Sequence, residues 1–187
     1  MPENVQALYL CATAAMPLLP TIRTLRSTLQ AAGAHRALVQ EVLEQGRAAA
    51  AQHVFTACFD EEALAAAQRA DEALAQGRPL PPLAGLPVTV KDLYDIEGRT
   101  TMAGSVLREG RPPTARDSAA VARLRAAGAA ITGLTNMTEF AFSGVGINPH
   151  HGTPRNPCDA AVARIPGGSS SGAAVSVALG LAVAGLG

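Results

Sequence analysis

Apolar residues in the first eighty positions recur three or four apart, the spacing that places side chains on one face of a helix. This pattern predicts three helices, over residues 21–32, 36–54 and 60–77. Gly33 would end the first helix. Asp60 would supply the N-cap of the third helix, which is rich in alanine. The chain is thus expected to begin with a largely helical region.

After a proline-rich break at 79–82, the pattern changes to short apolar runs bounded by glycine and proline. Two such runs, 85–92 and 129–134, predict buried strands. Between them, Asp117 is expected to cap a helix over 118–127.

The remaining sequence predicts a short helix over 137–142, a long loop over 144–168, and an apolar helix over 172–184. Strands that alternate with helices are typical of an α/β fold. The chain contains no internal repeat.

Composition narrows the class of protein. The chain has 187 residues, of which 48% are hydrophobic and 16% charged, so it can build a core and does not resemble a disordered tail. Its 15 basic residues balance its 15 acidic residues. Neither nucleic acid nor a membrane surface is therefore an expected partner. Aromatic residues make up 3%, which also disfavours base-stacking surfaces.

Cysteine usage and the N-terminal stretch both bear on the compartment. Cys11, Cys58 and Cys158 are an odd number, widely spaced and without a CxxC motif, which favours a reduced cytoplasmic setting. Residues 7–15 are apolar, but the stretch before them holds Glu3 and no Lys or Arg. A secretory signal begins with positive charge, so an irregular or helical leader is preferred.

The sequence offers little for a metal site. His150 and His151 are adjacent on a predicted loop and lack the spacing of metal ligands. We expect no metal and no other cofactor.

Lys91 is the first candidate for chemistry, because it ends an apolar strand and is followed by Asp92. Burial disfavours an ammonium and lowers its pKa, and a neutral amine can serve as a general base. The alternative is a strand-end lysine that extends into solvent, and Lys91 taken alone favours that alternative. If Lys91 is a base, we expect the Asp92 carboxylate to point away from it.

The second candidate is the run 167–171, Gly-Gly-Ser-Ser-Ser, which opens the apolar helix 172–184. Hydroxyls and free backbone N–H groups gathered there suit an anion or a developing oxyanion. The run lacks the lysine of a phosphate-binding loop and the pattern of a dinucleotide fingerprint. A flexible linker is the alternative, but the apolar helix argues against it. With Lys91, the serines suggest a serine–lysine hydrolase.

Five segments, in order, resemble the motifs of the amidase signature family. They are the lysine-bearing segment 85–92, then 101–105, 135–140, 152–157, and the glycine/serine segment 166–172. The earlier helices are similar to the helical lead-in of that family. The resemblance implies the family fold, a mixed central sheet covered by helices, of which this chain is an incomplete N-terminal portion. Residues 1–80 would form the lead-in and 85–187 the start of the catalytic core.

The resemblance also implies roles for individual residues. Lys91 matches the base of a Ser-cisSer-Lys triad, and Ser169 matches the bridging serine, which follows a cis peptide bond in the family. Ser169 would relay a proton between the nucleophile and Lys91. Ser170 and Ser171 would cap the helix or support the triad.

A substrate-binding segment is implied as well, formed by Ala141, Phe142, Ser143 and Gly144. The nucleophilic serine of the family lies roughly two dozen residues after the bridging one, in a Gly-Gly-Ser turn. By this count the turn would fall about six residues beyond Gly187. We therefore expect the chain to stop before its own nucleophile.

These resemblances lead to three hypotheses. In the first, the full-length parent hydrolyses a small-molecule carboxamide through an acyl-serine, while this chain alone is inactive. In the second, the chain is a non-catalytic fragment. In the third, it is part of an amidotransferase A-type subunit. A homodimer of the full-length enzyme remains open.

Overall fold

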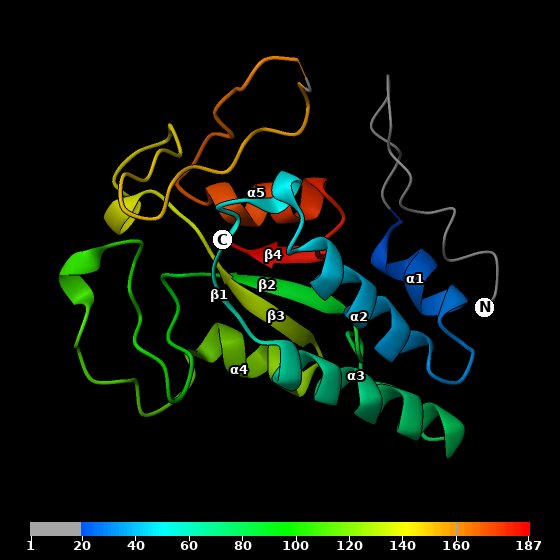
Figure 1. The fold of residues 1–187 in the computed structure, drawn as a ribbon. Helices are drawn as coiled ribbons and strands as arrows, with labels where there is room; N and C mark the ends of the chain where they lie inside the picture. The colour runs from blue at the N-terminus through cyan, green and yellow to red at the C-terminus, as the bar shows by residue number, and fades with distance from the viewer. Residues whose placement is uncertain (1–19, 160) are drawn as a thin grey trace.

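The computed structural model describes residues 20–159 and 161–187 (Figure 1). The predictions for Cys11 and for the stretch 7–15 lie outside these residues. Within them, no helix has both the length and the apolar character that a membrane span requires. The elements, in chain order, are α1 (Ile22–Thr28), α2 (Ala34–Gln45), η2 (Ala49–Ala51), β1 (Phe55–Cys58), α3 (Asp60–Ala75), β2 (Pro87–Lys91), η3 (Val106–Arg108), α4 (Ala119–Ala126), β3 (Ala130–Thr135), η4 (Glu139–Ala141), α5 (Ser171–Ala178) and β4 (Ala184–Leu186).

Four strands form one mixed sheet in the order β1-β3-β2-β4 (Figure 1). β2 is parallel to both of its neighbours, β3 and β4. β1 runs antiparallel to β3 at the edge. The predicted α/β class is confirmed, and the mixed sheet matches the architecture that the family resemblance implied.

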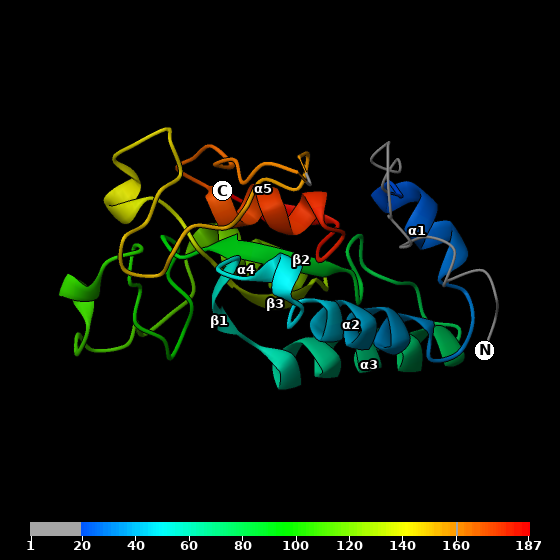
Figure 2. The ribbon, with the colours of Figure 1, turned by 45° about the horizontal axis from the view of Figure 1, so that its top comes forward.

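Helices cover both faces of this sheet. In Figure 2, α5 lies above the strands and α3 lies below them. Side chains of β2 alternate between the two faces, as the two-residue period of a strand requires. Thr89 meets α5, where its hydroxyl lies 2.9 Å from that of Ser176. Val90 points the other way, into a cluster that contains Val121 of α4. Lys91, two residues after Thr89, therefore emerges on the α5 side.

The start of α2 is held by a carboxylate from α3. Gly33, at the N-cap, offers no side chain to the free N–H groups. Asp71 takes that place, because it accepts hydrogen bonds from the backbone N–H groups of His35 and Arg36, at 3.1 and 3.0 Å. It also contacts the His35 ring nitrogen at 2.9 Å. This buried contact fixes α2 against α3.

The first part of the chain contains one strand that the sequence pattern did not predict. The expected helix 36–54 is shorter, because α2 ends at Gln45. The chain then turns through Gly46 and η2 into β1. β1 has only four residues, and its place is set by pairing with β3, so local periodicity gives no signal for it.

The last predicted helix, 172–184, is likewise too long. α5 ends at Ala178, and Gly180 follows with a φ of +75°, a left-handed conformation typical of a glycine after a helix. The chain then forms β4, which pairs with β2. The apolar run across 173–184 fits a helix and a strand equally well, and only the sheet decides between them.

Three further expectations about short helices and helix caps are corrected by the structure. The predicted helix 137–142 is the single turn η4, in which Phe140 has a φ of 49°. Ser118, and not Asp117, occupies the N-cap of α4. The Asp117 carboxylate instead forms an ion pair with Arg125 at 2.9 Å. Asp60 is itself the first residue of α3, so it lies beyond the N-cap that was expected of it.

Candidate functional site

Lys91, the last residue of β2, is the centre of the candidate site. Its side chain crosses to the loop before α5, where the amine donates to the hydroxyls of Ser169 and Ser170, at 2.8 and 2.9 Å. The residue is only 5% exposed. Burial lowers the pKa of the amine from its ordinary value of 10.5. The structure thus brings together two residues that lie far apart in the sequence, Lys91 and Ser169.

The number of lysines in the sequence also points to Lys91, independently of the family motifs. Lys91 is the only lysine in the chain, and all other members of the fifteen basic residues are arginines. A guanidinium stays protonated at any ordinary pH, whereas a buried lysine amine can lose its proton. Among the lysine and arginine side chains that the structure describes, Lys91 is thus the one that is buried, and it is also the one that can lose its proton.

The serine loop is held in place by backbone contacts. The peptide bond between Gly168 and Ser169 is cis, as the family resemblance implied. The Ser169 carbonyl accepts from the N–H of Thr138 at 3.0 Å, and the Gly168 N–H donates to the Gly144 carbonyl at 2.8 Å. A Cβ on Gly168 would lie 2.7 Å from Cα of Gly146, so no larger residue fits there.

The start of α5 rests on the chain that follows β3. The Gly172 N–H donates to the Asn136 carbonyl at 2.9 Å, and the Ser171 hydroxyl reaches the same oxygen at 3.3 Å. The fully buried Asn136 amide in turn donates to the carbonyls of His53 and Gly152, at 3.0 and 2.8 Å. Asn136 therefore links α5 to the segments before β1 and after residue 148. Asn136 lies in the segment 135–140 that resembles a family motif, but the sequence did not predict that its side chain links these segments.

Asp92 points away from Lys91, as expected for a lysine that acts as a base. Its carboxylate is fully buried and accepts long hydrogen bonds, 3.3 Å each, from the backbone N–H groups of Met102 and Gly104. Burial raises the pKa of Asp92, and these two hydrogen bonds oppose that rise. The Asp92 carboxylate thus anchors the loop after β2 and not the amine.

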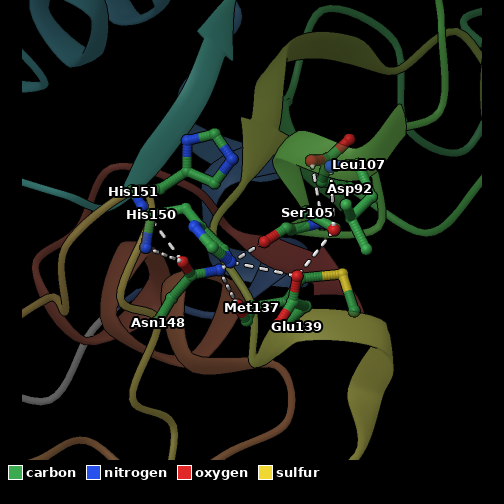
Figure 3. A network of polar contacts seen from close by, with 9 residues as sticks. Asp92, Ser105, Leu107, Met137, Glu139, Asn148, His150 and His151 are labelled. Carbon is green, nitrogen blue, oxygen red and sulfur yellow. Dashed lines mark hydrogen bonds and ion pairs between the residues drawn. The ribbon is translucent and has the colours of Figure 1, made fainter. Parts of the chain in front are cut away.

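A polar network joins this loop to two others (Figure 3). Glu139 accepts from the Ser105 hydroxyl at 2.6 Å and contacts the His150 ring at 3.0 Å. Its hydrogen bond with Ser105 is the main reason that the Glu139 pKa is lowered. The Asn148 amide donates to the Met137 carbonyl at 2.8 Å and its oxygen accepts from the His150 N–H at 2.8 Å. These contacts fix the loops that surround the serine segment.

One residue of the predicted substrate-binding segment, Gly144, is hydrogen-bonded to the serine loop. The Gly144 carbonyl accepts from Gly168, as described above. Ala141 is the last residue of η4. The Ser143 hydroxyl accepts a hydrogen bond from the backbone N–H of Val145 at 3.1 Å. Phe142 is 92% exposed. The binding role of these four residues stays a prediction.

His150 and His151 both take part in hydrogen bonds of the loop at 148–151. Across residues 20–159 and 161–187, no three His, Cys, Asp or Glu side chains are grouped so that they could hold a metal ion.

Together these features define an α/β protein in which a buried lysine at the end of a parallel strand contacts two serines of a glycine-rich loop. The family model described as Amidase matches residues 37–187. The chain belongs to this family, the amidase signature family.

Three curated relatives illustrate its range. The chain is 48% identical over 128 residues to the AtzE subunit of 1-carboxybiuret hydrolase from Pseudomonas sp. (strain ADP), covering 68% of this chain and 28% of that protein. It is 47% identical over 127 residues to 2-amino-5-chloromuconic acid deaminase of Comamonas testosteroni, covering 67% and 27%. It is 43% identical over 136 residues to the A-type subunit of glutamyl-tRNA(Gln) amidotransferase from Prochlorococcus marinus (strain MIT 9303), covering 72% and 27%.

Solved structures agree with this assignment. The chain resembles one from "an unexpected vestigial protein complex" that "reveals the evolutionary origins of an s-triazine catabolic enzyme", with a TM-score of 0.79, 40% identity, and coverage of 88% of this chain and 36% of that one. It also resembles the peptide amidase PAM in complex with the competitive inhibitor chymostatin, with a TM-score of 0.73, 33% identity, and coverage of 87% and 34%. The chain therefore spans about a third or less of the length of the proteins it matches.

Proposed function

We propose that the full-length parent of this chain is an amidase that hydrolyses a small-molecule carboxamide through a Ser-cisSer-Lys triad. Lys91 is the base and Ser169 is the bridging serine. The observation that carries this proposal is the 2.8 Å contact between the buried Lys91 amine and the Ser169 hydroxyl. No metal or other cofactor takes part in the proposed reaction.

In this reaction the nucleophilic serine lies in the part of the parent that follows residue 187. Its hydroxyl proton passes to the Ser169 oxygen while the Ser169 proton passes to the neutral Lys91 amine. The freed oxygen attacks the amide carbonyl, and the same relay returns a proton to the departing amine or ammonia. Water then attacks the acyl-serine ester, which releases the acid and restores the nucleophile.

The electrostatics of the site support the role of Lys91. Burial lowers the pKa of the amine, so the neutral form needed in a base becomes accessible at lower pH. A facing carboxylate would oppose this, because it would stabilise the ammonium. Asp92, the nearest acidic residue in sequence, instead binds the loop at 102–104.

The direct test uses the parent enzyme. Replacing Lys91 by Ala, or Ser169 by Ala, should reduce amide hydrolysis by several orders of magnitude, about 10⁴–10⁶ in analogous hydrolases. Lys91→Arg should fail as well, because a guanidinium cannot accept the proton. An arginine variant with near-normal kcat would show that Lys91 acts only by its charge or its packing.

The chain of 187 residues should itself show no turnover above background, because the proposed nucleophile is outside it. Downstream coding DNA gives a second test. A Gly-Gly-Ser turn in frame after residue 187 supports the parent enzyme, whereas a true stop codon supports the non-catalytic fragment. Hydrolysis by the 187-residue chain that Ser169→Ala abolishes would place the nucleophile within it.

A second candidate is an amidotransferase A-type subunit, favoured by the 43% identity to a relative of that kind. Such a protein would depend on partner subunits and on charged tRNA. Amide hydrolysis by the purified parent alone would favour the amidase, and strict dependence on added partners would favour the amidotransferase. Self-association of the parent into a homodimer remains a separate prediction, which sedimentation can test.

A further inference from the structure

Ser170 occupies an unusual position for a serine at the start of a helix. A serine at the N-cap normally accepts a hydrogen bond from a backbone N–H one turn into the helix. Ser170 is the N-cap of α5, yet its side chain makes no such bond. Its hydroxyl instead accepts from the Lys91 amine at 2.9 Å. The contact with Lys91 has thus taken the place of the usual cap.

The hydroxyls of Ser169 and Ser170 contact the same amine, and they have different roles when that amine is neutral. A neutral primary amine has two N–H donors and a single lone pair. To take the Ser169 proton, Lys91 must direct its lone pair at that hydroxyl. A second hydroxyl that accepts one N–H fixes both the place and the orientation of the amine, because it opposes rotation about the Cδ–Cε bond as well as the Cε–Nζ bond.

The Ser170 side chain is itself confined. A Cβ on Gly187 would lie 2.9 Å from the Ser170 hydroxyl oxygen and 3.0 Å from its Cβ, so the backbone after β4 packs directly on this serine. That backbone is held in turn by Tyr94, whose hydroxyl donates to the Gly187 carbonyl at 3.1 Å. Ser170 is therefore fixed between the amine and the end of β4.

We propose that Ser170 is a positioning residue, which accepts an N–H of Lys91 and so directs the amine lone pair at Ser169. This inference rests on the proposed function, because it gives Ser170 a purpose only if Lys91 acts as a base. It predicts a measurable property of Lys91 that does not depend on turnover, namely the restriction of its side chain.

The single lysine makes this property accessible in the chain of 187 residues. Lysine labelled with ¹³C at Cε reports Lys91 alone in an NMR spectrum. A fixed side chain places its two Hε protons in different surroundings, so the wild type should give two Hε resonances above the pKa of the amine. In Ser170→Ala, rotation about the Cδ–Cε bond should average these surroundings, so that the two resonances merge. Ser170→Thr retains the hydroxyl and should restore the two resonances.

Ser118→Ala is the matched control. Ser118 is also a helix N-cap whose side chain makes no capping bond, and its buried hydroxyl has no hydrogen-bond partner. This variant should keep both resonances, because it removes a hydroxyl from a helix N-cap without changing a contact of the Lys91 amine. If Ser170→Ala melts early, Ser170→Cys replaces it, because a thiol keeps the volume but is a weak acceptor.

Two resonances in the variant without the Ser170 hydroxyl would overturn the proposal. So would a single resonance in the wild type, or a failure of Ser170→Thr to restore the pair. The proposed function fails by a different result, an ordinary pKa for Lys91. A lowered pKa with unchanged splitting in Ser170→Ala would thus keep Lys91 as the base and remove Ser170 from its positioning.

Discussion

Gly172, the second residue of α5, is predicted to tolerate no side chain, although its backbone conformation is not one that requires glycine. A Cβ there would lie 2.3 Å from the Val54 carbonyl oxygen, 2.6 Å from the Asn136 nitrogen and 2.9 Å from the Asn136 oxygen. All three atoms belong to the backbone, so no side-chain rotation relieves the contact. Gly172→Ala must therefore move α5 away from the chain that follows β3.

The size of the effect follows from these contacts. Atoms added to a packed core typically lower the unfolding free energy by about 1–3 kcal/mol. Because the neighbours of Gly172 are backbone atoms that cannot rotate away, we expect Gly172→Ala to lower it by about 3 kcal/mol. For a chain of this length, each kcal/mol lowers the melting temperature by about 2–4 °C. Gly172→Ala should therefore melt about 6–12 °C below the wild type.

Thermal unfolding followed by circular dichroism tests this expectation, with Gly144→Ala as the control. A Cβ on Gly144 meets no atom within 4 Å, and its φ is not in the left-handed region. Alanine should be neutral there or stabilise by about 0.4–1 kcal/mol, through the unfolded chain. Equal melting temperatures for the two variants would refute the proposed packing of α5 on Asn136.

Three other predictions concern buried polar groups. Asp71→Ala should lower the unfolding free energy by about 1–3 kcal/mol in urea titrations, because the N–H groups of His35 and Arg36 lose their acceptor; an unchanged midpoint would argue against this cap. Asp92→Asn should also lower the unfolding free energy by about 1–3 kcal/mol, because an amide NH2 group replaces one of the two oxygens that accept hydrogen bonds. A more stable variant would contradict the role of Asp92 in anchoring the loop after β2. Burial lowers the folded-state pKa of Lys91, so the unfolded chain binds more protons between that pKa and 10.5. The stability of the wild type relative to Lys91→Met should therefore rise with pH across this window, and a flat difference would refute the shift.

The local sequence pattern was sufficient to predict those elements whose structure depends on their own residues. The run that ends at Lys91 is apolar, short and bounded by glycine and proline, and β2 forms there. The glycine and serine run before α5 likewise contained enough information to place Ser169 beside Lys91, through resemblance to a family. Both features are visible in the sequence without knowledge of the sheet.

Other features depend on partners that are distant in sequence. β1 and β4 have four and three residues, and their pairing with β3 and β2 is what defines them. The contact between Lys91 and Ser170 joins residues 79 positions apart. The Asp71 carboxylate caps α2 through the N–H of His35, which lies 36 residues earlier. Periodicity describes one segment at a time and cannot predict such contacts.

A base must be able to exist in its neutral form, so the pKa of the Lys91 amine is the decisive quantity for the proposed triad. The ¹³Cε resonance of the only lysine in the chain can be followed across a pH titration, with Ser118→Ala as a control. We expect a single titration with a midpoint clearly below 10.5, the ordinary value. A midpoint at or above that value would mean that Lys91 stays an ammonium, and the proposed relay through Ser169 would be wrong.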